Sequence, residues 1–60
     1  MLATEIQTHA RKLLETHGPK AILEAAQKAR TFEEKGDREQ AGTWRRIEAA
    51  LLQLRGPNAS

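Results

Sequence analysis

Two glycines bound a helix-forming segment in residues 17–37, HGPKAILEAAQKARTFEEKGD. Gly18 is expected to end one helix, because glycine adopts the left-handed conformation of a C-terminal cap, and Pro19 to begin the next as its first residue. Gly36 ends that second helix in turn. Asp37 has the spacing to Gln40 that is typical of a capping pair at the start of a third helix.

The composition of the chain favours an all-α fold. Valine and tyrosine are absent, whereas Ala, Leu, Glu, Gln, Lys and Arg dominate, which are residues that favour helices and rarely form strands. The sequence predicts one domain over 1–60 with helices at about 4–17, 19–35 and 38–55 and a frayed tail at 56–60. Because both connections are short, consecutive helices are expected to lie roughly antiparallel, as a three-helix bundle or as a helical hairpin with an appended helix, possibly dimeric.

Each predicted helix has an apolar stripe at helical spacing, and two leucines lie off these stripes. The stripes consist of Leu2, Ile6, Ala10, Leu13, Leu14 and His17, then Ile22, Ala25, Ala26, Ala29 and Phe32, then Ala41, Trp44, Ile47, Leu51 and Leu54. Leu23 points away from the stripe of its helix, and Leu52 lies off the centre of its own. They are either isolated exposed leucines, which are ordinary on protein surfaces, or parts of a dimer contact together with an exposed edge of Trp44.

No residue pattern indicates catalysis, a metal site or a cofactor. His9 and His17 are eight residues apart rather than the three or four that bring two imidazoles together on a helix. Glu48 is a single acid among apolar residues and is expected to pair with Arg45 one turn away. Since a chain of this length forms one small core, we expect no enzyme, no cofactor, no metal and no small-molecule substrate.

The charge pattern leaves two kinds of partner open. Arg38, Arg45 and Arg46 lie on or near the outer side of the third helix and are candidate contacts to nucleic acid, although Asp37 and Glu39 at its start would repel phosphate. The formal net charge is only +2, with acids and bases interspersed, which favours a protein partner, first of all a second copy. The absence of a membrane-length apolar run, and of a basic N-terminal region followed by an apolar run, predicts a cytoplasmic protein without membrane contact.

Several spaced residues resemble a family of short, uncharacterised proteobacterial all-helical proteins. The most specific matches are His17-Gly18, Gly36-Asp37 and the segment Trp44-Arg45-Arg46-Ile47. This resemblance covers nearly the whole chain and implies a small bacterial protein, without implying an activity.

A second, weaker similarity is to a single tetratricopeptide hairpin, through Gly36-Asp37, Ala41 and Gly56-Pro57-Asn58. That repeat has a small residue at the position that Glu48 occupies here, and one hairpin does not form the stacked array through which such repeats bind peptides. Taken together, the sequence predicts a small non-catalytic protein that acts through protein–protein contact in an adaptor or regulatory role, with nucleic-acid binding as the alternative.

Overall fold

The chain folds into three helices connected by turns of two residues. The structure, a computed structural model, describes the backbone of residues 3–55 and the side chains of residues 4–54. The helices are α1 (Ala3–His17), α2 (Lys20–Lys35) and α3 (Arg38–Arg55), and no strand occurs within this part of the chain. The predicted all-α class is therefore confirmed. The predicted tail at 56–60 and the stripe position Leu2 lie outside the described residues.

The turn between α2 and α3 has the geometry that its residues predict. Gly36 adopts φ = 81°, in the left-handed region, and its N–H donates to the Glu33 carbonyl. The Asp37 N–H donates to the Phe32 carbonyl at 2.9 Å, so the last turn of α2 is closed by two backbone bonds. The Asp37 carboxylate then accepts from the Gln40 N–H at 3.1 Å, which confirms the predicted cap of α3.

The first turn and the first helix differ slightly from the prediction. Gly18 has φ = 63° and closes α1 as expected. Pro19, at φ −59° and ψ −22°, precedes α2 as its N-terminal cap residue rather than forming its first residue. α1 begins at Ala3, one residue before the predicted start at residue 4, and ends at His17 as predicted.

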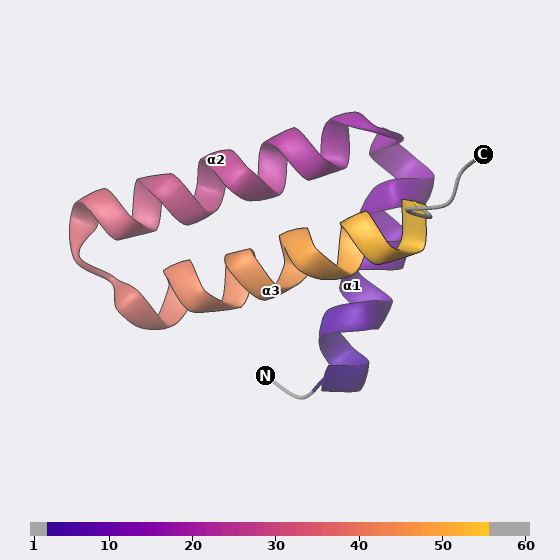
Figure 1. Cartoon of the computed structure of the whole chain (residues 1–60). Helices are drawn as coiled ribbons and strands as arrows, with labels where there is room; N and C mark the ends of the chain where they lie inside the picture. The colour runs from indigo at the N-terminus through magenta and orange to yellow at the C-terminus, as the bar shows by residue number, and fades with distance from the viewer. Residues whose placement is uncertain (1–2, 56–60) are drawn as a thin grey trace.

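The three helices form a hairpin with one helix across it. Figure 1 shows α2 and α3 side by side and antiparallel, joined at the 36–37 turn, while α1 runs across the opposite end of this hairpin. α1 packs more extensively against α3 than against α2. The expectation that consecutive helices are antiparallel thus holds for α2 and α3 and is wrong for α1 and α2. Pro19 is already helical directly after the left-handed Gly18, and this places α2 across α1.

The core lies between the hairpin and α1 and consists largely of alanine. Ile47 and Leu51 of α3 are completely buried, and Ile6 of α1 is nearly so. The other buried residues are Ala10, Ala21, Ala25, Ala29 and Ala41. Alanines on facing helices allow a close approach of the two backbones but bury little apolar area per residue, so the core is small even for this chain length.

The apolar stripes are buried unevenly. Leu13, Leu14, Ile22 and Trp44 are half-buried and pack against the core, whereas Leu54 in the last turn of α3 remains 36 % exposed. In the described part of the chain, no helix combines the length and the apolarity that crossing a bilayer requires.

Candidate functional site

The two off-stripe leucines are the most exposed large apolar side chains among residues 4–54. Leu23 of α2 is 60 % exposed and Leu52 of α3 is 47 % exposed. Leu23 precedes Gly36 by 13 residues and Leu52 follows it by 16, so in an antiparallel hairpin their levels differ by about 4.5 Å along the axis. One partner surface can therefore contact both.

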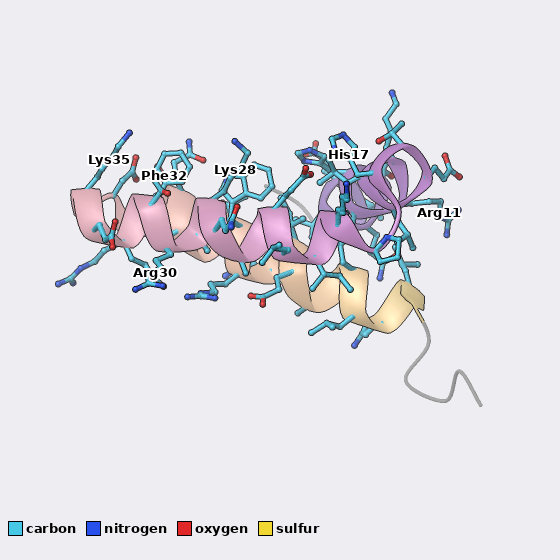
Figure 2. The ribbon with its side chains drawn as sticks, turned by 90° about the horizontal axis from the view of Figure 1, so that it is seen from above. Arg11, His17, Lys28, Arg30, Phe32 and Lys35 are labelled. Atoms are coloured by element: carbon cyan, nitrogen blue, oxygen red, sulfur yellow. The ribbon has the colours of Figure 1, made fainter. Side chains whose placement is uncertain are left out.

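Both leucines face the side of the hairpin that α1 leaves uncovered. Leu23 lies seven residues before Arg30 on the same side of α2, and Figure 2 shows Arg30 on the side opposite α1. Leu52 lies seven residues after Arg45 and therefore on the same side of α3. Arg45 in turn bonds to Glu33, which lies one turn from Arg30 on α2. The sequence prediction that these two leucines lie off the core is confirmed.

Half-buried residues connect the leucines into one surface, which we call the leucine face. It comprises Ile22, Leu23 and Ala26 of α2 and Glu48 and Leu52 of α3. Ile22 and Ala26 are half-buried, and the Glu48 side chain retains 24 % of its exposure. The leucine face is therefore apolar at its centre, with one carboxylate at its margin.

An ion cluster lies on the same side, towards the 36–37 turn. Arg45 donates to Glu48 at 3.1 Å, which confirms the predicted pair, and also to both carboxylate oxygens of Glu33 at 3.2 Å. The hydrogen bonds that Arg45 donates, first to Glu33 and then to Glu48, raise the pKa of its guanidinium above the ordinary value. A second pair joins Arg30 and Glu34 at 3.7 Å. Arg30 and Arg45 on this side are thus each paired with glutamate within the chain.

Sequence reasoning missed the contribution of Glu33. Glu33 and Arg45 are twelve residues apart and lie on different helices, so no helical spacing rule connects them. Their contact follows from the register of α2 against α3, which the spacing within either helix does not contain. The available signal was the short turn between α2 and α3. It predicts that the two helices form a hairpin, but it does not specify how each helix is rotated about its own axis.

Trp44 does not share a surface with the two leucines. Its ring is half-buried and makes an edge contact with His9 of α1, with 5.6 Å between ring centroids. On the α2 side, Lys28 Nζ lies 5.6 Å from the centre of the same ring. The three predicted interface residues are thus divided between the two sides of the hairpin.

The three arginines of the alternative prediction do not form one surface. Arg38 and Arg45 line a shallow concavity beside Glu33 and Gly42, where Arg45 is already bound by two carboxylates. Arg46 lines a separate groove between α1 and α3. A nucleic-acid backbone would meet the guanidinium group of Arg45, which is already bound by carboxylates, and those of Arg38 and Arg46, which lie in separate concavities.

The histidines are placed apart from each other. His17 Nδ1 lies 2.8 Å from Glu24 Oε1 and connects the end of α1 to α2, whereas His9 lies against Trp44. Between residues 3 and 55, no group of three or more His, Asp or Glu side chains is arranged to hold a metal ion.

Comparison with family models, with curated proteins and with solved structures gives no match to this chain. The role of the leucine face and of the ion cluster is therefore inferred from their geometry alone.

Proposed function

We propose that this protein acts through protein–protein contact, in an adaptor or regulatory role, and that its leucine face is the contact surface. The observation that carries the proposal is the exposure of Leu23 and Leu52 on the side of the hairpin without a third helix. Large apolar side chains grouped on one surface are typical of interaction sites. The proposed action is binding rather than catalysis, in the bacterial cytoplasm.

The partner that the leucine face fits best is a second copy of the chain. The ion cluster beside it contains two arginines and three glutamates that are paired within the chain, so two copies would meet without strong repulsion. A second copy would also supply apolar burial to a core in which five of the eight buried residues are alanine.

The size of the face sets the strength of this contact. Two helices of 16 and 18 residues give the whole side of the hairpin that carries the leucine face a length of about 25 Å and a width of about 20 Å, or about 500 Å² on each copy. The total of about 1,000 Å² lies at the lower limit for specific interfaces. We therefore expect a reversible dimer with a dissociation constant in the micromolar range.

Sedimentation equilibrium over a range of protein concentrations tests the proposal. Leu23→Glu and Leu52→Glu are each expected to remain helical by circular dichroism and to weaken self-association at least tenfold, because each places a carboxylate at the centre of the contact. Leu54→Glu is the matched control, since Leu54 is an exposed leucine of α3 that follows the buried Ile47 by seven residues and so faces away from the leucine face.

Two results would argue against the proposal. If the wild-type chain is monomeric at all concentrations, the second copy is not the partner. If Leu23→Glu and Leu54→Glu reduce association equally, the leucine face is not the contact. Binding of duplex DNA that weakens steeply with salt would instead favour the nucleic-acid alternative.

A further inference from the structure

The side of the hairpin opposite the leucine face carries two aromatic rings with lysines over them. Lys28 Nζ lies 5.6 Å from the centre of the Trp44 ring, and Lys35 Nζ lies 5.8 Å from the centre of the Phe32 ring. Figure 2 shows Lys28, Phe32 and Lys35 projecting from α2 to the same side, which is the side of α1. We call this surface, formed by Lys28, Phe32, Lys35 and Trp44, the ring face.

The lysines of the ring face have no carboxylate partner within the described side chains of residues 4–54, in contrast to Arg30 and Arg45 on the other side. Arg30 and Arg45 are each paired with glutamate. The ammonium groups of Lys28 and Lys35 contact only ring faces, which attract cations but do not neutralise them. Lys28 and Lys35 therefore present two ammonium groups without an ion-pair partner on the side of α1.

The third helix covers only part of this side. Figure 1 shows α1 crossing the hairpin at the end far from the 36–37 turn, so no described helix runs along the half of α2 and α3 near that turn. Phe32 is half-buried on this side, and Trp44 is half-buried at the border with α1, where the edge of its ring meets His9. The ring face thus offers two apolar rings in a position where a further helix would lie beside α1.

We propose that the ring face binds an acidic amphipathic helix of a partner protein. Lys28 and Lys35 are seven residues apart on α2, which separates them by about 10.5 Å along the helix. Carboxylates seven residues apart on a helix aligned with α2 have the same separation, and each meets one ammonium group. Apolar side chains on the same stripe of the bound helix cover Phe32 and Trp44, which is the arrangement of a helix bound in a groove.

A peptide helix fits this surface better than a nucleic acid does. The ring face supplies two ammonium groups, whereas nucleic-acid binding generally relies on many phosphate contacts. Glu24, which contacts His17, lies one turn from Lys28 and lines the same concavity, so it would repel a continuous phosphate chain. An acidic helix needs only two matched contacts and has no charge at its apolar positions.

Trp44 reports binding directly, because it is the only tryptophan in the chain. The probe is a synthetic helical peptide without tryptophan, with leucines along one stripe and glutamates seven residues apart beside it. The expected result is a saturable change in Trp44 emission as the peptide covers the ring. The same peptide with lysine in place of glutamate is expected to produce no saturable change.

Variants locate the contact. The double variant K28E/K35E is expected to weaken binding of the acidic peptide about tenfold or more, since two attractive pairs become repulsive, and K28Q/K35Q is expected to show a smaller loss. Arg30→Glu changes a cation on the same helix but on the opposite side and is expected to bind like the wild type. Circular dichroism confirms that each variant remains helical.

Specific results would overturn this assignment. They are the absence of a saturable emission change with the acidic peptide, equal weakening by K28E/K35E and Arg30→Glu, or a preference for a single-stranded oligonucleotide over the peptide. The proposal is independent of self-association, because Leu23→Glu is expected to bind the peptide normally. Loss of the dimer alone would therefore leave the ring face unaffected, and loss of peptide binding alone would leave the leucine face unaffected.

Discussion

Arg45 of α3 holds Glu33 of α2 through two hydrogen bonds of 3.2 Å, one from Nε and one from Nη2. This paired geometry, in which both carboxylate oxygens accept from one guanidinium, gives the ion pair a defined orientation. It connects the two helices on the side without α1. The cluster therefore adds a directional contact to the packing that sets how α2 and α3 are rotated against each other, and with it the separation of the leucine face from the ring face.

Arg45→Met is expected to lower stability at low salt and to have a smaller effect at high salt. The Arg45 and Glu33 side chains are about half exposed, so their attraction is screened by mobile ions. Urea denaturation at low and at high sodium chloride measures this difference. Arg46→Met is the control, since Arg46 has no ion-pair partner within residues 3–55. An equal salt dependence for both variants would show that the Glu33 contact does not hold the hairpin.

Gly42→Ala is expected to stabilise the protein by about 0.5–1 kcal/mol, because glycine inside a helix loses more conformational freedom on folding than alanine does. A Cβ built at Gly42 meets no atom within 4 Å, so the methyl group introduces no clash. The urea midpoint measures the gain. A loss of stability would indicate that another chain approaches the α3 backbone closely at this position.

Gly36→Ala is expected to have the opposite effect and to destabilise the protein by about 1–2 kcal/mol. Gly36 has φ = 81°, where a side chain is strained even though the space around it is open. Gly36→Asn is expected to be less harmful, because asparagine tolerates the left-handed region. Thermal denaturation of the three chains gives the order Gly, Asn, Ala. Equal melting temperatures for the Asn and Ala variants would contradict the strain argument.

Leu51→Ala is expected to cost about 2–5 kcal/mol and to leave the chain largely unfolded, because a single core of this size supplies only a margin of about 3–5 kcal/mol. Leu51 is completely buried, whereas Leu54 on the same helix is 36 % exposed. Leu54→Ala should therefore retain the helical circular dichroism that Leu51→Ala loses. Similar helicity in both variants would mean that the core does not depend on Leu51.

The helices of this chain could be predicted from the chemistry of single residues. The arrangement of the helices could not, because it depends on packing between them. The glycine breaks at Gly18 and Gly36 and the Asp37 cap follow from backbone geometry, which single residues determine. The crossing of α1 over the hairpin depends on the Gly18-Pro19 turn together with the fit of the Ile6 and Ala10 stripe against Ile47 and Leu51. Such a fit is a property of two surfaces together.

The same limit applies to the candidate sites. The outward positions of Leu23 and Leu52 could be predicted because helical periodicity alone places them. The position of Trp44 on the side of α1 could not be predicted, because it depends on which flank of the α3 stripe packs against α1 and which packs against α2. The lysines over the rings were missed for the same reason, as Lys28 and Trp44 are neighbours only across the hairpin.

The alanines between α2 and α3 also have a consequence for the order of folding. Ala21, Ala25, Ala29 and Ala41 have no side-chain rotamers to lose, so burying these four residues costs backbone entropy alone. Its contacts are close in the sequence, which favours rapid formation. We expect the hairpin to form first and α1 to dock afterwards, so that amide hydrogens of α1 exchange with solvent faster than those of α3.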